Sequence, residues 1–328
     1  MKEPSPVPDN VTYHPGDSIS ENWHIVRLLG SGSYGQVYLA ENNSRHELKR
    51  AVKVLRRDDT GVSSGVYQDA VRRFNQEASL GANPKLKKNP YLLEVYDFFP
   101  ENDHLTMWMD YAPGGSLAER LSECKEKGLL LPVEQAVNWG LQIAEGLAAL
   151  HDPAIDVVHR DLHPGNILFD STASDAHALV ADLGLAQMPG APSSRYLSGN
   201  MSAHPGHPSY RSPEHENPNR ALTPAADVYV LGMLLFEMLT GQRYINHEGK
   251  HVRAMRKDVP LWLDTLIFHM LSRDPLKRPQ NGAANGYETP LYLISPIRKT
   301  SFHTCTIPPS DRRIYHSGVL WITKAVHH

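Results

Sequence analysis

Two short segments in the middle of the chain hold acidic and amide side chains at a spacing that suits phosphate chemistry. Asp161 ends the sequence His-Arg-Asp, and Asn166 follows five positions later. Asp182 begins the sequence Asp-Leu-Gly after a strand-like run. An aspartate can orient an attacking hydroxyl, while an asparagine and a second aspartate can hold Mg²⁺ on phosphate groups. A polar loop capped by aspartate would explain either segment alone, but their order and spacing favour the catalytic interpretation.

A glycine-rich segment near the N-terminus is typical of loops that cover phosphates. Residues 30–37 read Gly-Ser-Gly-Ser-Tyr-Gly-Gln-Val and lie between β-like runs at 23–29 and 36–40. In dinucleotide-binding folds such glycines lie between a strand and a helix. Between two strands they form a flap whose backbone N–H groups cover a triphosphate. Taken alone, the segment is equally compatible with a flexible hairpin turn.

A lysine in a third segment requires an anionic partner. Lys53 follows Ala51 and Val52 on an apolar, strand-like run. An ammonium that faces a core without a partner is costly, so phosphate oxygens or a carboxylate should lie beside it. Glu77, on a stretch with helical spacing, is the candidate carboxylate. The alternative is a lysine at a strand edge that reaches out to water.

These segments need a small sheet and a group of helices to position them. Before residue 112 the pattern predicts one helix over 67–81 and strands over 23–29, 36–40, 50–55, 92–99 and 104–111. After it, apolar residues at helical spacing predict helices over 133–151 and 262–271. The stretch 223–240 is apolar nearly all round, which predicts a buried helix. The sequence therefore predicts a β-rich part with one main helix, followed by a larger, mainly helical part.

Composition excludes several classes of protein. The 328 residues are 41% hydrophobic, with a formal net charge of −3 and two cysteines. This is enough to bury a core, gives no basic field for nucleic acid and suggests no disulfide framework. The most apolar run, 230–239, is about half the length of a membrane span and contains Glu237. We therefore expect a cytoplasmic protein without a nucleic-acid partner or stable membrane insertion. The sequence does not indicate its oligomeric state.

The two ends of the chain differ in composition from the part between them. Residues 1–22 are rich in proline, serine and aspartate, which predicts a disordered or loosely packed leader. Residues 281–328 contain several prolines and short apolar runs, and their structure and role stay open. All the segments that carry chemistry lie between these two ends.

The motifs and their order resemble those of the eukaryotic-type protein kinase family over residues 23–279. Three further positions match this family: Glu214 after Ser-Pro, Asp227 on the buried helix, and Arg278, which resembles the arginine that pairs with the glutamate. The resemblance implies an α+β, two-lobed protein kinase-like domain over 23–280. A small antiparallel β-sheet lobe with one main helix would span about 23–111, and a larger, mainly helical lobe about 112–280.

The same resemblance implies an activity and a role for each site residue. The chain would transfer the γ-phosphate of ATP to Ser/Thr hydroxyls of proteins, itself included, with ATP and Mg²⁺ as cofactors. Asp161 would be the catalytic base or the group that positions the hydroxyl. Lys53, held by Glu77, would contact the α- and β-phosphates, and Asn166 and Asp182 would bind magnesium. The adenine would lie among Leu29, Val37, Ala51, Leu168 and Met109, with hinge contacts from Asp110 and Ala112. The flap over the phosphates would consist of Gly30, Ser31, Gly32, Ser33, Tyr34, Gly35, Gln36 and Val37.

Three positions depart from the family pattern. His163 stands where family members that act on Ser/Thr usually have lysine, and His207 stands where they usually have threonine. Those two residues touch in family members, so we expect the histidines to be adjacent and nearby phosphates to raise the pKa of His163. Alternatively, both are neutral hydrogen-bonding residues. Gly81 lies four positions after Glu77, where family members have a side chain that links the lobes; a shift of one position would put Leu80 there.

Two other functions share this fold. A pseudokinase scaffold would bind partners without phosphate transfer, but it would be expected to lack Lys53, Asp161 or Asp182. The sequence His-Pro-Gly-Asn that ends at Asn166 also resembles small-molecule kinases of the aminoglycoside phosphotransferase type. These typically lack the activation segment that ends at Glu214 in this chain.

An active kinase would be regulated through serine or tyrosine in the segment between Asp182 and Glu214, because this segment contains no threonine. The candidates for phosphorylation are Ser193, Ser194, Tyr196, Ser198 and Ser202.

Overall fold

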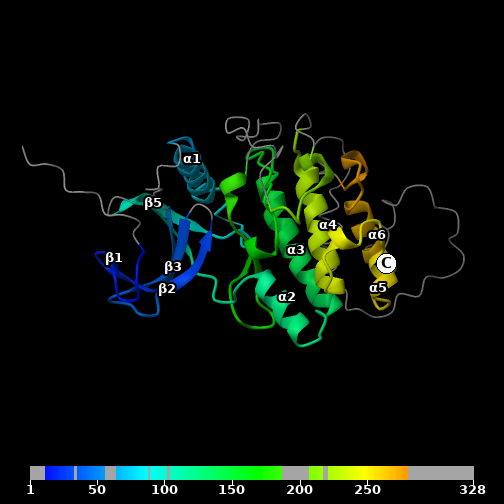
Figure 1. Cartoon of the computed structure of the whole chain (residues 1–328), viewed down its shortest axis with the longest axis horizontal. Helices are drawn as coiled ribbons and strands as arrows, with labels where there is room; N and C mark the ends of the chain where they lie inside the picture. The colour runs from blue at the N-terminus through cyan, green and yellow to red at the C-terminus, as the bar shows by residue number, and fades with distance from the viewer. Residues whose placement is uncertain are drawn as a thin grey trace, which may run out of the picture.

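The computed structural model describes residues 12–32, 35–55, 64–87, 89–101, 104–186, 207–216 and 221–279. These residues form a strand-rich lobe beside a helical lobe (Figure 1). The first lobe is a six-stranded antiparallel sheet with the strand order β1-β2-β3-β4-β6-β5. Its strands are β1 (Ser18–Ser20), β2 (Trp23–Gly32), β3 (Gly35–Asn42), β4 (Lys49–Leu55), β5 (Val95–Glu101) and β6 (His104–Asp110).

Alternation along the strands gives this sheet two buried faces. On the inner face, Ala51 and Met109 pack against Phe74 of α1 (Ser64–Gly81). On the outer face, Tyr38 and Trp108 belong to a separate apolar cluster. The inner face is the one that carries the residues expected around adenine.

The N-terminal segment is part of the sheet lobe. β1 pairs with β2 in antiparallel register, and Tyr13 and Ile19 are buried in the cluster on the outer face. The prediction of a loosely packed leader is therefore wrong for residues 12–22, because these two apolar side chains cover the outer face of the sheet. Residues 1–11 lie outside the described part of the chain.

The helical lobe surrounds α4 (Pro224–Thr240), which is buried along nearly its whole length. Around it lie α3 (Val133–Leu150), α5 (Val252–Met255) and α6 (Leu261–Met270). The three long helices agree with the predicted ranges to within one residue at each end. None of the helices in the described ranges has the length and apolar character needed to cross a membrane.

One helix of this lobe was not predicted. Helix α2 (Leu117–Glu126) follows the connection between the lobes. The Ser116 side chain accepts a hydrogen bond from the backbone N–H of Glu119, and the Glu119 carboxylate accepts one from the backbone N–H of Ser116. This reciprocal capping box begins the helix and was present in the sequence as Ser-x-x-Glu.

A short hairpin of the helical lobe joins the sheet lobe through backbone hydrogen bonds. The hairpin consists of β7 (Ile167–Phe169) and β8 (Ala178–Val180). The N–H of Leu93 donates to the carbonyl of Val180 at 2.9 Å, and the N–H of Val180 donates to the carbonyl of Tyr91 at 2.8 Å. The predicted strand over 92–99 therefore began too early, because the residues just before β5 pair with β8 instead.

Gly81 has no side chain, and the space beside it is filled by a side chain of β5. A Cβ at this position would lie 2.3 Å from Cγ2 of Val95 and 2.7 Å from its Cβ. Val95 is buried in the inner-face cluster, so it occupies the space next to the end of α1. Leu80 packs instead on the core of the helical lobe. The glycine that departs from the family pattern is thus explained by a valine from another element.

Gly81→Ala should therefore lower the free energy of unfolding by about 1 kcal/mol, measured by urea unfolding. Overpacking costs about 1–3 kcal/mol, which outweighs the gain of about 1 kcal/mol in helix propensity. Adding Val95→Ala should make the combined loss smaller than the sum of the two single losses. Gly30→Ala is the control, because a Cβ there meets nothing within 4 Å. Additive losses would contradict the interpretation that Val95 occupies the space next to Gly81.

Candidate active site

Lys53 lies on the inner face of β4 and contacts two carboxylates. Its Nζ is 2.6 Å from Oε2 of Glu77 in α1 and 3.5 Å from Oδ1 of Asp182 in the helical lobe. Burial disfavours the ammonium, but the charges of Asp182 and Glu77 outweigh this effect and raise the pKa of Lys53. The lysine therefore stays protonated and joins three elements. The expected contact with Glu77 is present, and the lysine does not reach out to water alone.

Asp182 has an unusual backbone conformation. Its φ of 62° and ψ of 74° lie in the left-handed region, which costs a non-glycine residue about 1–3 kcal/mol. Its Oδ1 accepts a hydrogen bond from the N–H of Gly184 at 3.3 Å. Burial opposes the charge of this carboxylate, but Lys53 and the Gly184 N–H prevail and lower its pKa. The strained turn thus holds an ionised carboxylate beside Lys53.

Asp161 is held at both its side chain and its backbone. The N–H of His207 donates to Oδ1 of Asp161 at 2.7 Å. The amide nitrogen of Asn166 donates to the carbonyl of Asp161 at 2.9 Å, so the amide oxygen is what Asn166 can offer to a metal. Burial, and then the charge of Asp182, raise the pKa of Asp161 to about 6. A carboxylate of this basicity suits proton transfer near neutral pH.

A buried aspartate fixes the loop that carries Asp161. Asp227 of α4 accepts hydrogen bonds from the backbone N–H groups of His159 at 2.8 Å and Arg160 at 3.1 Å. Asp227 has a third contact, with Nε2 of His151 at 2.8 Å from its Oδ2, and His151 was not among the predicted site residues. Both side chains are at most 2% exposed. The available signal was a histidine directly after an apolar helix, where a buried polar ring needs a partner.

Four of the residues expected around adenine lie in one cluster on the inner face of the sheet. Leu29, Val37, Ala51 and Met109 belong to it, and Ala51 lies opposite Met109 in the pairing of β4 with β6. Leu168 is half-buried in β7 of the other lobe, outside this cluster. The sheet therefore supplies four of these side chains together, and the helical lobe supplies the fifth.

The described part of the glycine-rich segment lies at the end of the hairpin formed by β2 and β3, between two strands as expected. Residues 30–32 end β2 and residues 35–36 begin β3, with Gly32 opposite Gly35. At Gly35 a Cβ would lie 2.4 Å from the carbonyl oxygen of Val54, so only glycine fits there. Ser33 and Tyr34, at the tip of the segment, lie outside the described residues.

The hinge residue Asp110 has a side chain that is already engaged. It ends β6, and its carboxylate accepts a hydrogen bond from the hydroxyl of Tyr96 at 2.5 Å and lies 3.6 Å from Arg50. Ala112 follows it in the connection that leads to α2. The adenine base could therefore hydrogen-bond to the backbone of this connection, because the Asp110 carboxylate already has other partners.

The two unusual histidines are adjacent, as expected. The ring centroids of His163 and His207 are 4.9 Å apart. Each Nδ1 accepts a backbone N–H, from Gly165 at 3.1 Å and from Ser209 at 3.2 Å. Burial, and then His207, lower the pKa of His163 to about 4, and burial also lowers the pKa of His207. In the protein alone desolvation dominates and both rings act as neutral acceptors, and the rise in the pKa of His163 beside bound phosphates stays a prediction.

Glu214 and Arg278 form a buried, bidentate ion pair. Nη1 and Nη2 of Arg278 lie 2.5 Å and 2.8 Å from the two carboxylate oxygens, and the side chains are 0% and 2% exposed. The guanidinium also donates to the carbonyls of Ala225 and Ser272, each at 2.8 Å. The expected pairing is present and fixes residues 213–216 to the end of the helical lobe.

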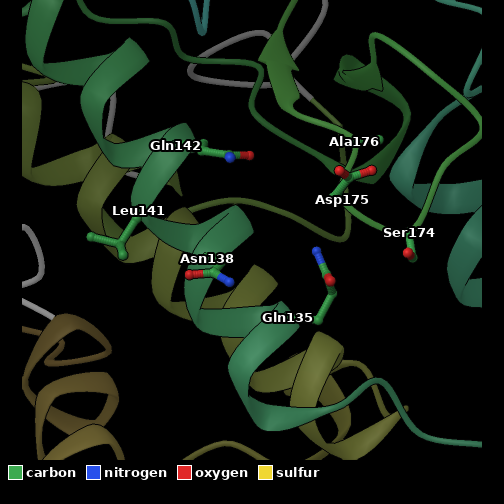
Figure 2. A pocket seen from close by; sticks show the side chains of 7 residues that line it. All are labelled: Gln135, Asn138, Leu141, Gln142, Ser174, Asp175 and Ala176. Carbon is green, nitrogen blue, oxygen red and sulfur yellow. The ribbon is translucent and has the colours of Figure 1, made fainter. Parts of the chain in front are cut away.

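A hollow of about 350 Å³ lies apart from these residues. Figure 2 shows it between α3, with Gln135, Asn138 and Gln142, and the turn before β8, with Ser174 and Asp175. Its lining contains none of the residues expected to bind ATP or to act in catalysis. The hollow is therefore separate from the candidate active site.

The sequence of this chain is similar to those of known proteins. Residues 23–286 match the family described as protein kinase domain. The chain is 32% identical over 280 residues to the serine/threonine-protein kinase pkn2 of Myxococcus xanthus, covering 79% of this chain and 31% of that protein. It is 31% identical over 276 residues to the serine/threonine-protein kinase PrkC of Bacillus subtilis, covering 80% and 39%.

A solved structure supports the likeness in fold. The kinase domain of PknI from Mycobacterium tuberculosis has a TM-score of 0.58 and 24% identity, covering 81% of this chain and 94% of that domain. The two-lobed fold, the pair of Lys53 with Glu77 and the loop held by Asp227 together are typical of protein kinases. This chain belongs to the protein kinase family. It spans 31% and 39% of the lengths of the first two curated relatives.

Glu214→Gln should lower the free energy of unfolding at pH 7 by about 3–5 kcal/mol, because it leaves the Arg278 guanidinium buried without a counter-charge. Arg278 lowers the folded-state pKa of Glu214 against the opposing effect of burial. Its stabilisation is thus complete above the ordinary pKa of about 4.3 and is lost as the pH falls through the lowered value. Urea unfolding at pH 7 and pH 3.5 should therefore show a smaller difference between wild type and variant at pH 3.5.

The matched control for this measurement is Glu123→Gln. Glu123 pairs with Lys127 on the surface at 3.4 Å, with side chains that are 64% and 63% exposed. Its loss should change the free energy of unfolding by no more than about 1 kcal/mol. A Glu214→Gln effect as small as that of the control would show that the buried pair contributes little to stability.

Proposed function

We propose that this chain transfers the γ-phosphate of ATP to serine or threonine hydroxyls of protein substrates. The contact of Lys53 with Glu77 at 2.6 Å and Asp182 at 3.5 Å carries this proposal. In protein kinases the lysine–glutamate pair and the aspartate that holds Mg²⁺ must both be in place for transfer. In this chain the three side chains meet from the sheet, from α1 and from the helical lobe.

Asp161 would act on the acceptor hydroxyl. The His207 N–H holds one carboxylate oxygen, so the second oxygen is the one that would accept the proton. With a pKa of about 6, this carboxylate is a stronger base than an ordinary aspartate and is still mostly ionised at pH 7. Lys53 would meanwhile hold the α- and β-phosphates through its fixed positive charge.

The residues of the site fit Mg²⁺. Mg²⁺ prefers oxygen ligands and is usually held by one or two protein groups together with phosphates. Asp182 offers an ionised carboxylate, and Asn166 offers its amide oxygen because its nitrogen donates to Asp161. The metal would supply charge neutralisation on the phosphates, and these two residues would hold it there.

The acceptor class is proposed from the relatives. Both pkn2 and PrkC are named serine/threonine-protein kinases, and we extend this class to the present chain. We also propose that the chain is cytoplasmic and phosphorylates itself. The five candidate residues between Ser193 and Ser202 lie outside the described residues. We place the kinase domain at 23–280, with residues 12–22 packed on its sheet.

Asp161→Asn should lower the rate of phosphate transfer by about 100-fold or more, because general-base catalysis contributes about 10²–10⁴-fold. The affinity for ATP should change by less than about threefold, since Asp161 serves the hydroxyl and not the nucleotide. The measurement is transfer of labelled phosphate from Mg²⁺-ATP to a generic basic protein, followed by phosphoamino-acid analysis. Asp175→Asn, an exposed aspartate beside the hollow, is the control and should retain the wild-type rate.

Two outcomes would count against the proposal. A rate for Asp161→Asn within tenfold of wild type would remove the role of Asp161. Phosphotyrosine as the main product would exclude the proposed acceptor class while leaving phosphate transfer intact.

The rate of transfer should fall as the pH decreases through about 6. Protonation removes the base at Asp161, whose pKa is raised to about 6, whereas His163, with a pKa of about 4, stays neutral. Rate–pH profiles from pH 5 to 8.5 for wild type and His163→Gln should therefore share the same acidic limb. If the limb disappears in His163→Gln, the histidine is the titrating group and the assignment to Asp161 is wrong.

A further inference from the structure

A line of hydrogen bonds connects the N-terminal segment to the strand that carries the phosphate flap. The backbone N–H of Tyr13 donates to the hydroxyl oxygen of Tyr38 at 3.2 Å, and this hydroxyl donates to Oε1 of Gln36 at 2.7 Å. The two tyrosine rings pack edge to face, with centroids 5.6 Å apart. Tyr38 is 0% exposed, so its hydroxyl interacts with protein partners in place of water.

The N-terminal segment is anchored at further points. We call residues 13–20 the N-terminal strap. The N–H of Gly16 donates to the carbonyl of Ile25 at 2.8 Å, and the N–H of Ile25 donates to the carbonyl of Asp17 at 2.9 Å. Gly16 has a φ of +94°, which favours glycine, and the strap residue Ile19 is buried in the outer-face cluster. The strap therefore has a fixed position on the outer face of the sheet.

The strap contacts the stretch of β3 whose opposite side faces the candidate active site. Val37 lies on the inner face, opposite Lys53 in the pairing of β3 with β4. Its neighbours Gln36 and Tyr38 lie on the outer face, because successive side chains alternate. Gln36 also lies opposite Ser31 of the flap in the pairing of β2 with β3. The hydrogen bonds from the strap thus end at Gln36, where β3 enters the flap. We call this part of β3 the flap root.

We propose that Tyr13, Tyr38 and Gln36 are positioning residues that set the position of the described part of the flap, residues 30–32 and 35–37, relative to bound ATP. The proposal rests on ATP as the nucleotide of the proposed function. The three side chains lie on the outer face of the sheet and act through the backbone of β3, so Gln36 takes part in the flap through its backbone alone. Loss of the hydrogen bonds would let the flap root shift, which weakens contacts to the phosphates and leaves the adenine pocket and Asp161 in place.

Tyr38→Phe in the full chain tests this proposal, because it keeps the packed ring and removes both hydrogen bonds. Calorimetric titration should show Mg²⁺-ATP binding about five- to tenfold more weakly, as expected for one or two lost hydrogen bonds. Adenosine, which lacks phosphates, should bind within twofold of wild type. Gln36→Met should give the same pattern for Mg²⁺-ATP and adenosine, and in Tyr38→Phe kcat should stay within about twofold while KM for ATP rises.

The matched control is Thr106→Val. Thr106 is 0% exposed, and its hydroxyl donates to the carbonyl of Phe99 at 2.9 Å, on β6 and away from the flap. It should lower the melting temperature about as much as Tyr38→Phe and leave the affinity for ATP unchanged.

Equal weakening of ATP and adenosine in Tyr38→Phe would mean a merely structural role and would overturn the proposal. So would unchanged ATP binding in both Tyr38→Phe and Gln36→Met while wild-type transfer activity is intact. Failure of the wild-type chain to bind Mg²⁺-ATP would instead reject the proposed function, and this inference with it.

Discussion

The positive charge of Lys53 is the constraint on which the arrangement of both lobes depends. The lysine lies on an apolar strand, where an ammonium without counter-charges would be strongly disfavoured. Glu77 can reach it only if α1 packs on the inner face of the sheet, and Asp182 only if the helical lobe lies close by. The positions of one helix and of the second lobe are therefore tied to a single buried charge. The strained backbone at Asp182 is part of the same requirement.

Buried charges fix the helical lobe in the same way. Asp227 holds the loop before Asp161 by accepting two backbone N–H groups, and Glu214 holds residues 213–216 by pairing with Arg278. Asp227 is part of α4, and Arg278 donates to the carbonyl of Ala225 in the same helix. The loops at the site are thus connected to the most deeply buried part of the protein. This explains how irregular segments keep a defined geometry around Asp161.

Much of the fold and site was predictable because long periodic patterns and buried charges leave clear signals. Helices α3 and α4 matched because their apolar spacing extends over many turns. The pairing of Lys53 with Glu77 followed from the cost of an isolated charge, and that of Arg278 with Glu214 from the family resemblance. The N-terminal strap was missed because a three-residue strand has no measurable periodicity. The fit between Gly81 and Val95 joins positions on different elements, and the pKa of His163 depends on burial. Both properties arise from tertiary structure, so local sequence patterns could not predict them.

The backbone pairing of Tyr91 and Leu93 with Val180 has a mechanical consequence. The stretch between α1 and β5 is attached to β8, two residues before Asp182, by bonds that no side-chain rotation can loosen. Backbone therefore links the sheet lobe to the helical lobe here and at the connection after β6, in addition to the side-chain contact of Lys53 with Asp182. These hydrogen bonds hold the strand that leads to Asp182 against the stretch that follows α1, the helix that carries Glu77.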